Sequence, residues 1–174
     1  MAENFFDSRK LTQVASGIRM LALDVDGVLT DGRLHFDSKG KESKIFHAHD
    51  GYGIRSIIKL GLQIALISGR ESNAVRKRAG ELGIEKVFQG VSRKDLILQR
   101  LINECGYEWK EVAYVGDDIP DAECLTLAGL GVAVADAHAD IKLLANWQTT
   151  KGGGRGAVRE VCDLLFDAQS TKKD

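Results

Sequence analysis

Short apolar runs alternate with segments of helical periodicity along most of the chain. Most strand-length runs are followed by a stretch in which apolar residues recur every three or four positions. This alternation predicts an α/β, doubly wound, mostly parallel sheet with helices on both faces. The predicted strands cover 19–25, 62–68, 86–90, 111–118, 130–135 and 147–150. The predicted helices cover 51–61, 71–82, 92–105 with Ser92 as N-cap, 121–129, 139–146 and 156–169.

One stretch departs from this rhythm. Residues 32–51 contain two alternating runs around the turn sequence DSKGK, which predicts a β-hairpin over about 32–48. No repeat or linker divides the chain, so we expect one domain over 1–174 with a C-terminal tail from about 151. The polar end STKKD is expected to be disordered.

Composition excludes several classes of protein. The chain is 44% hydrophobic and 28% charged with a net charge of -1, as in soluble globular proteins. No basic run interleaved with aromatic residues indicates a nucleic-acid partner, and no apolar stretch approaches a membrane span. The first ten residues lack a signal-peptide pattern, which predicts a cytoplasmic protein. Cys105, Cys124 and Cys162 form no CxxC, so we expect reduced thiols that pack as apolar side chains.

Polar side chains follow three of the predicted strands. The carboxyl ends of parallel strands meet at one edge of a sheet, where ligands bind. Carboxylates gathered there suit Mg²⁺, which prefers oxygen ligands, and a substrate phosphate would complete its shell. The residues at these strand ends are Asp24, Asp26, Ser68, Gly69, Arg70, Asp117 and Asp118.

Four segments resemble the motifs of haloacid dehalogenase-type phosphatases. They are DVDGVLTDG, ISGR, Lys94 and GDDIPD, in that order along the chain. The resemblance implies that Asp24 is the nucleophile that becomes an aspartyl phosphate. It implies that Asp26 is first general acid and then general base. Ser68 would bind the phosphoryl oxygens, and Lys94 would neutralise charge on the phosphate and on Asp24.

The same resemblance implies where the metal is held. Asp24, the backbone carbonyl of Asp26, and Asp117 are the expected Mg²⁺ ligands, with Asp118 and Asp121 as supporting or additional carboxylates. The chain is expected to bend at Asp26–Gly27, where the glycine permits it.

The intervals between the motifs leave no room for a cap domain. The intervals 27–67 and 69–93 hold only the hairpin, two helices and a short strand. An uncapped site is open, so a neighbouring subunit is expected to close it. This layout resembles the 3-deoxy-D-manno-octulosonate 8-phosphate phosphatases of lipopolysaccharide precursor synthesis, from about residue 18 to 169. The matching segments are HDGYGIR, SGR, GDD, AVADAHAD and GGGRGAVREVCDLL.

That resemblance implies a homotetramer in which the hairpins pack together and a C-terminal segment reaches a neighbouring active site. A sugar-acid phosphate is anionic at both ends, and arginine suits both groups. The family commonly has arginine where this chain has His49, and histidine is only partly charged near neutral pH. The residues expected to bind substrate are His47, His49, Asp50, Gly51, Arg55, Gly69, Arg70, Arg78 and Arg155, the last from a flexible glycine run.

Other interpretations stay open at this stage. The substrate is an eight-carbon or a nine-carbon, sialic-acid-type sugar phosphate. A non-catalytic assembly module is a further alternative, although the intact Asp24, Asp26, Lys94 and Asp117 argue against it. A receiver domain also holds an aspartyl phosphate, but it lacks a late GDDxxD motif. His47 and His49 would share one face of a strand and form half of a metal site, for which no third ligand is evident.

Overall fold

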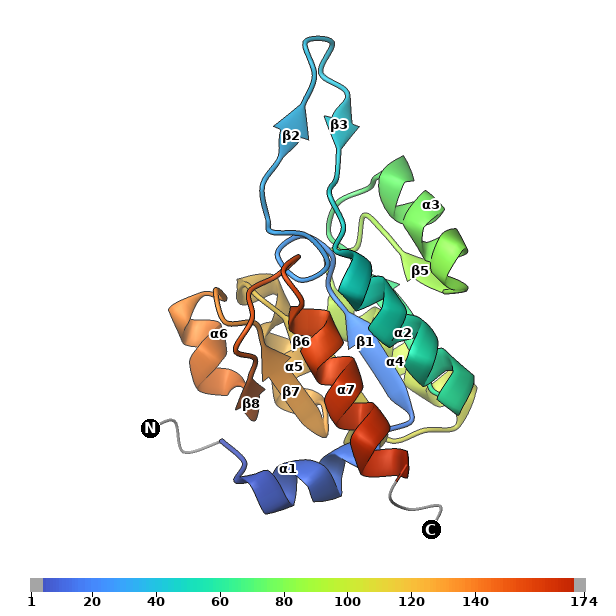
Figure 1. Cartoon of the computed structure of the whole chain (residues 1–174), viewed down its shortest axis with the longest axis vertical. Helices are drawn as coiled ribbons and strands as arrows, with labels where there is room; N and C mark the ends of the chain where they lie inside the picture. Colours follow the sequence, from blue (N-terminus) through green and yellow to red (C-terminus); the bar gives the residue numbers. More distant parts are fainter. Residues whose placement is uncertain (1–4, 171–174) are drawn as a thin grey trace.

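The computed structural model describes residues 5–170. Its main sheet has six strands in the order β5-β4-β1-β6-β7-β8, and every neighbouring pair is parallel (Figure 1). This order confirms the predicted doubly wound topology. The strands are β1 Met20–Leu23, β4 Gln63–Ile67, β5 Lys86–Phe88, β6 Val112–Gly116, β7 Leu130–Ala133 and β8 Trp147–Gln148.

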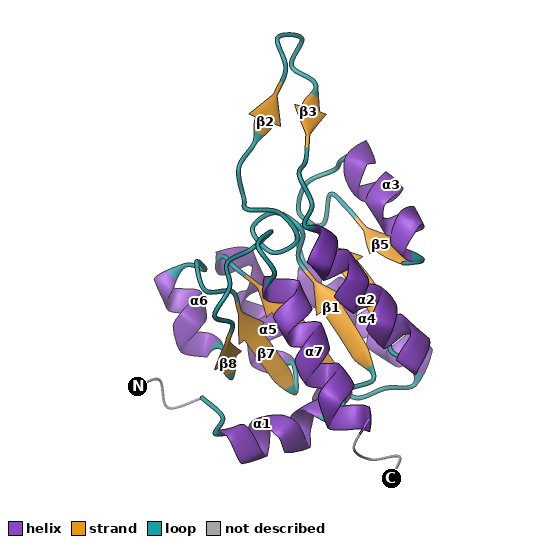
Figure 2. Ribbon diagram, viewed as in Figure 1, coloured by secondary structure: helices purple, strands orange, loops and turns teal. Residues whose placement is uncertain are grey.

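Helices cover both faces of this sheet. Helices α2 and α7 pack together over one face, with α1 against α7 and α3 beside α2, while α4, α5 and α6 form the opposite layer (Figure 2). The helices are α1 Ser8–Ala15, α2 Ala48–Leu60, α3 Asn73–Leu82, α4 Lys94–Cys105, α5 Ala122–Leu127, α6 Ala139–Leu144 and α7 Ala157–Ser170. Two 3₁₀ turns, η1 Trp109–Glu111 and η2 Ile119–Asp121, flank β6.

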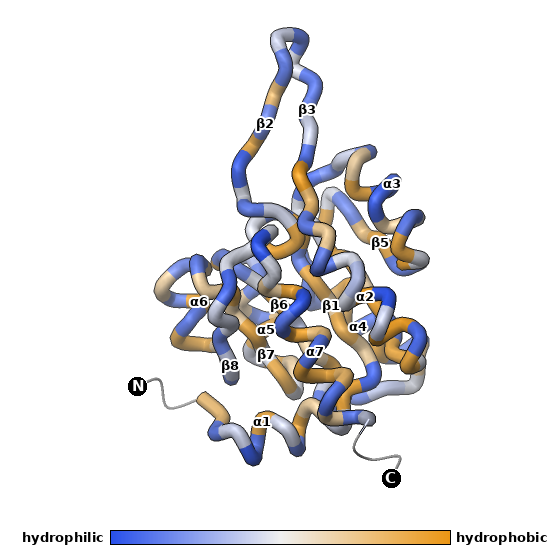
Figure 3. Tube along the Cα trace, viewed as in Figure 1, coloured by the Kyte–Doolittle hydropathy of each residue, from blue (hydrophilic) through white to orange (hydrophobic). Residues whose placement is uncertain are grey.

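The core lies in the middle of the sheet. Every residue of β1, β6 and β7 is buried, because these strands are covered on both faces, and the hydropathy of the chain follows this arrangement (Figure 3). From β1 the chain continues to β4 and β5 on one side of the sheet and then crosses to β6, β7 and β8 on the other side. The strand order therefore reverses between β1 and β6. A ligand site is expected at the carboxyl ends of this pair.

The predicted hairpin is present and projects from the body of the molecule (Figure 1). Its strands, β2 His35–Phe36 and β3 Glu42–Ser43, pair over only two residues each. Between β1 and β4 the chain has only this hairpin and α2, and between β4 and α4 only α3 and β5, so the predicted absence of a cap domain is confirmed.

Two details differ from expectation. Arg93, not Ser92, is the N-cap of α4, and no side-chain cap bond forms there. His47 is the N-cap of α2 and His49 lies in its first turn, so the two do not share a strand face. The ends of the helices that cover the sheet were predicted to within a few residues, because apolar periodicity marks them. The identity of a capping residue depends on local hydrogen bonds, which periodicity does not show.

Helix α1 was not predicted from the sequence. Its N-cap Asp7 accepts from the backbone N–H of Lys10 at 2.8 Å. Gln169 of α7 donates to the carbonyls of Ala15 and Ile18, which fastens the end of α1 to the last helix. The helix is short and polar, and it depends on tertiary contacts.

The polar end STKKD falls outside the described residues from 171 on, while Ser170 ends α7. All three cysteines are free thiols. No helix in the described part of the chain has both the length and the apolar character needed to cross a membrane.

Candidate active site

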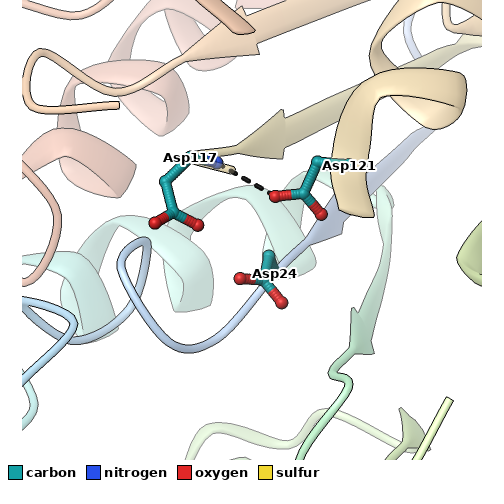
Figure 4. A group of neighbouring side chains, drawn as sticks. All are labelled: Asp24, Asp117 and Asp121. Carbon is teal, nitrogen blue, oxygen red and sulfur yellow. Dashed lines mark hydrogen bonds between the residues drawn. The ribbon is translucent and has the colours of Figure 1, made fainter. Parts of the chain in front are cut away.

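Three carboxylates meet where β1 and β6 end. Asp24 directly follows β1, Asp117 directly follows β6, and Asp121 closes the turn η2. One ligand oxygen from each lies within 4.8 Å of the others, and the side chains point toward one another (Figure 4). Asp24 and Asp121 are only 6% and 1% exposed. The strand order therefore brings together residues that are 93 positions apart in sequence, counting from Asp24 to Asp117.

Lys94 supplies the positive charge next to this cluster. It is the first residue of α4 and is 4% exposed. Its Nζ donates to Oδ1 of Asp24 at 2.6 Å and to Oδ1 of Asp121 at 2.7 Å. Burial lowers the pKa of Lys94, but the attraction of the two carboxylates outweighs it and the net shift is upward. Lys94 therefore stays charged, although one cation does not balance three carboxylates.

Burial and mutual repulsion raise the pKa of two of these carboxylates. Burial, followed by repulsion from Asp121, raises the pKa of Asp24 from 3.8 to about 6. Burial, followed by repulsion from Asp24 and Asp121, raises the pKa of Asp117 to about 8. Oxygen ligands in this crowded, negatively charged arrangement fit a hard divalent cation, which would remove the repulsion.

Asp121 is held by four donors. Its Oδ1 accepts from Lys94 and, at 2.6 Å, from the buried hydroxyl of Tyr114. Its Oδ2 accepts from the backbone N–H groups of Asp117 at 3.0 Å and Asp118 at 3.4 Å. Asp121 thus orients the loop that carries Asp117. Asp118 is exposed, and its side chain accepts from the N–H of Ile119 rather than joining the cluster.

The chain turns directly after the nucleophile position, as expected at Asp26–Gly27. Gly27 has φ of 94°, and a Cβ there would lie 2.0 Å from Oδ2 of Asp117. Only glycine suits both this conformation and this close approach. The hydroxyl of Thr30 accepts from the N–H groups of Gly27 and Gly32, each at 3.3 Å, which holds the turn in shape.

A cleft of about 330 Å³ opens above the carboxylates. Ser68 follows β4, is 1% exposed, and accepts from the backbone N–H of Arg70 at 3.2 Å. The cleft is lined by Asp24, Asp26, Gly32, Leu34, Ser68, Gly69, Arg70, Lys94, Asp117, Asp118, Pro120 and Asp121. All four motifs predicted from the sequence therefore line one cleft.

The glycine run before α7 packs against the turn that carries Asp26. A Cβ on Gly153 would lie 1.8 Å from the carbonyl oxygen of Gly27, and the N–H of Gly154 donates to the carbonyl of Val28 at 2.9 Å. Arg155 faces Asp31 of the same chain, with Nη2 and Oδ2 3.5 Å apart. We expected a flexible run, but the structure has an ordered support for the turn that carries Asp26, because only glycine allows such close backbone contact.

Asp50 lies between two helices and does not line the cleft. It is 1% exposed, and its Oδ1 accepts from the N–H of Arg159 in the first turn of α7 at 2.8 Å. Burial raises its pKa. In the described chain Asp50 therefore links α2 to the start of α7, a structural role that its sequence motif did not indicate.

Most of the other residues expected to bind substrate lie away from the cleft. Arg55 is exposed and donates to the backbone carbonyl of Glu81 at 2.7 Å, near the end of α3. Arg78 lies over Gly51, where a Cβ would be 2.3 Å from its Nη2. The rings of His47 and His49 stack edge to face at 5.0 Å. Of the expected substrate residues, only Gly69 and Arg70 line the cleft of the described chain.

Lys44 and Glu42, on the hairpin, were not predicted to belong to the site. The Lys44 side chain is 3% exposed and forms an ion pair with Asp26. Alternation places Lys44 and Glu42 on the same face of the hairpin. Nothing in the sequence pattern indicates that this face turns toward Asp26 rather than toward solvent.

A nucleophile-position aspartate, a second aspartate two residues on, a buried lysine and a late acidic loop together define a phosphatase of the haloacid dehalogenase class. Consistently, residues 86–160 match the family model of haloacid dehalogenase-like hydrolases.

Comparison with curated proteins narrows this class. The chain is 46% identical over 155 residues to the 3-deoxy-D-manno-octulosonate 8-phosphate phosphatase KdsC of Escherichia coli K12, covering 89% of this chain and 82% of the relative. It is 44% identical over 157 residues to KdsC of Yersinia pestis, covering 90% and 84%.

Solved structures agree. The phosphatase of Moraxella catarrhalis, in complex with magnesium ion, phosphate ion and KDO, superposes with a TM-score of 0.93 at 39% identity, covering 96% of both chains. A probable phosphatase of Pseudomonas syringae has a TM-score of 0.93 at 43% identity, covering 95% and 94%. The chain belongs to the family of 3-deoxy-D-manno-octulosonate 8-phosphate phosphatases.

The repulsion between Asp24 and Asp117 predicts how stability depends on pH and Mg²⁺. Because both pKa values rise above 3.8 in the fold, the protonated forms stabilise the metal-free protein at low pH, and this stability is lost as pH rises through about 6 and about 8. Mg²⁺ should therefore raise the Tm much more at about pH 8.5 than at about pH 5. Thermal melts with Mg²⁺ and with EDTA measure this.

Asp117→Asn is the decisive variant. It should raise the free energy of unfolding of the metal-free protein at alkaline pH by on the order of 2 kcal/mol and abolish the Mg²⁺ shift. Asp140→Asn, at an exposed position of α6, is the control and should keep the wild-type response. A Mg²⁺ shift that persists in Asp117→Asn would contradict the assignment of this cluster.

The close contact of Gly153 predicts a second result. Gly153→Ala should displace the turn at Gly27 and lower kcat by about 100-fold, because small misplacements of reacting groups are costly. Gly80→Ala, where a Cβ meets nothing within 4 Å, is the matched control. Steady-state kinetics measure kcat, and circular dichroism checks that the variant is folded. A wild-type kcat in folded Gly153→Ala would refute the proposed support of the turn by Gly153.

Proposed function

We propose that this chain hydrolyses 3-deoxy-D-manno-octulosonate 8-phosphate to the free sugar acid and phosphate, in a Mg²⁺-dependent reaction of lipopolysaccharide precursor synthesis. The observation that carries the proposal is the convergence of Asp24, Asp117 and Lys94 at the carboxyl ends of β1 and β6. Family membership supports the substrate, since the curated relatives are named for this activity.

The side chains allow a two-step reaction. In the first step a carboxylate oxygen of Asp24 attacks phosphorus, the bond from phosphorus to the sugar oxygen breaks, and Asp26 donates a proton to that oxygen. In the second step Asp26 takes a proton from water, which attacks the phosphorus of the aspartyl phosphate and restores Asp24. Lys94 and Ser68 hold the phosphoryl oxygens throughout, and Lys94 limits charge repulsion as Asp24 approaches them.

The proposed metal ligands are Asp24, Asp117 and the backbone carbonyl of Asp26, with Asp121 orienting the loop of Asp117. When bound, Mg²⁺ supplies charge neutralisation for the phosphoryl group and for its crowded carboxylates. The raised pKa of Asp24 and Asp117 supports a site adapted to such a cation.

Arg70 is the proposed contact for an anionic part of the substrate, since it lines the cleft and follows Ser68 and Gly69. His47, His49, Asp50, Gly51, Arg55, Arg78 and Arg155 stay predictions as substrate-binding residues. A nine-carbon sugar-acid phosphate is the alternative substrate, but the names of the relatives favour the eight-carbon acid.

We also propose that the chain forms a homotetramer through its hairpins. Leu34, Phe36 and Ile45 on the hairpin are 49%, 55% and 68% exposed, and apolar side chains gathered on a projecting element are typical of an interface. Residues 151–170 pack against their own chain, so contact between the tail and a neighbouring site stays a prediction.

The assigned roles predict the effect of two substitutions. Asp24→Asn should lower phosphate release from the sugar-acid phosphate by at least about 10³-fold, because it removes the nucleophile. Asp26→Asn should lower it by about 10²- to 10⁴-fold, because it removes the proton donor. Phosphate release is measured with and without Mg²⁺ on eight- and nine-carbon substrates, with Asp140→Asn as control. Substantial turnover by folded Asp24→Asn would reject the mechanism.

The interface proposal predicts a change of mass. Ile45→Lys, at the most exposed apolar hairpin position, should convert the tetramer to smaller species, because a charge is costly in an apolar interface. Leu143→Lys, on the exposed side of α6, is the control for an added charge at another exposed apolar position. Light scattering after size exclusion measures the mass, and an unchanged tetramer in Ile45→Lys would contradict a hairpin interface.

A further inference from the structure

The returning arm of the hairpin alternates between two environments. Ser43 and Ile45 are exposed, whereas Glu42 and Lys44 turn inward, with side chains 17% and 3% exposed. This is the period of two expected of an extended chain. A lysine this deeply buried is costly unless its charge is paired, so its partners matter.

Both partners of Lys44 are carboxylates. Its Nζ donates to Oδ1 of Asp26, and it lies 2.6 Å from Oε1 of Glu42. Oε2 of Glu42 in turn accepts from Nη2 of Arg70 at 3.0 Å. The bond from Lys44 lowers the pKa of Glu42, with a further contribution from Arg70. A continuous chain of charges therefore joins Asp26 in the first motif to Arg70 in the second through the hairpin.

The two oxygens of Asp26 have different surroundings. Oδ1 is held by Lys44, whereas Oδ2 is buried and has no hydrogen-bond partner among residues 5–170. Asp26 also lines the cleft above Asp24. Lys44 thus holds one oxygen of Asp26, and no hydrogen bond within residues 5–170 occupies the other.

We propose that Lys44 is a positioning residue that orients Asp26 for proton transfer to the leaving group. The inference rests on the proposed role of Asp26 as general acid. Asp26 lies on a turn rather than a strand, so its carboxyl group needs a partner to define its orientation. Lys44 provides that partner from the hairpin, and Glu42 with Arg70 holds Lys44 in place.

The leaving group separates this role from a purely structural one. An alkoxide from a sugar needs a proton as the ester bond breaks, whereas 4-nitrophenolate leaves readily without one. A misoriented Asp26 should therefore slow formation of the aspartyl phosphate from the sugar-acid phosphate and largely spare its formation from 4-nitrophenyl phosphate. Hydrolysis of the aspartyl phosphate, in which Asp26 is the proposed base, is common to both substrates, so the two are compared by kcat/KM, which covers only the steps up to release of the leaving group. A displaced hairpin or a damaged metal site would slow both reactions alike.

The experiment compares Lys44→Met with wild type on both substrates. For the sugar-acid phosphate, kcat/KM should fall by about 10- to 100-fold. For 4-nitrophenyl phosphate, kcat/KM should fall by less than about threefold, and the Mg²⁺-induced rise in Tm should persist. Lys44→Gln, which keeps a donor but no charge, is measured in parallel. If the methionine variant does not fold, the loss on the sugar-acid phosphate relative to the loss on 4-nitrophenyl phosphate is taken from the glutamine variant instead. Lys41→Met is the control, because Lys41 is an exposed lysine of the same hairpin.

Equal losses on both substrates would overturn the inference and leave Lys44 as a fastening of the hairpin, and unchanged kinetics would overturn it as well. Either result with an active wild-type enzyme leaves the proposed function standing. Failure of the wild-type enzyme to hydrolyse any sugar-acid phosphate would instead reject the proposed function and this inference together.

Discussion

Repulsion among three carboxylates, only partly offset by one lysine, is the constraint on which this structure depends. Asp24, Asp117 and Asp121 would not gather at a largely buried sheet edge for stability alone, since burying charge is costly. Lys94 balances part of that charge through short bonds to Asp24 and Asp121. The negative charge that Lys94 does not balance, together with burial, raises the pKa of Asp24 and Asp117. A bound cation would relieve this repulsion, so the folded chain favours cation binding at this position. A phosphoryl group needs positive charge around it, and Lys94 together with a bound cation would provide that charge at the same position.

Close backbone packing makes this concentration of charge geometrically possible. The reversal of strand order brings the ends of β1 and β6 together, but the side chains meet only because the loops approach closely. Gly27 leaves room for Asp117, and Gly153 in turn lies against Gly27. The glycine run that leads into α7 therefore supports the turn after β1. Asp50 continues this support by binding the start of α7.

Much of the fold and the centre of the site could be predicted because their causes are local. Apolar periodicity marks the strands and helices, and the order of strands places Asp24, Ser68 and Asp117 at one edge. The rest depends on contacts between distant segments. Helix α1 is only eight residues long, too short for its pattern alone to predict a helix, and it is held by Gln169. The inward turn of Lys44 follows from how the hairpin leaves the body. The contacts of Asp50, Arg55 and Arg78 within the chain likewise join distant segments, so no local pattern indicated them.

The hairpin shows how one short element can serve two purposes through alternation. Its outward residues, such as Ile45, are apolar and exposed, while the next position inward, Lys44, contacts Asp26. Because neighbouring residues of an extended chain face opposite sides, packing on the outer face would restrict the inner face as well. In an uncapped phosphatase the open cleft needs some other element to orient Asp26, the proposed general acid. Assembly through the hairpins would then stabilise the orientation of Asp26 without any direct contact between a neighbouring subunit and the reacting groups.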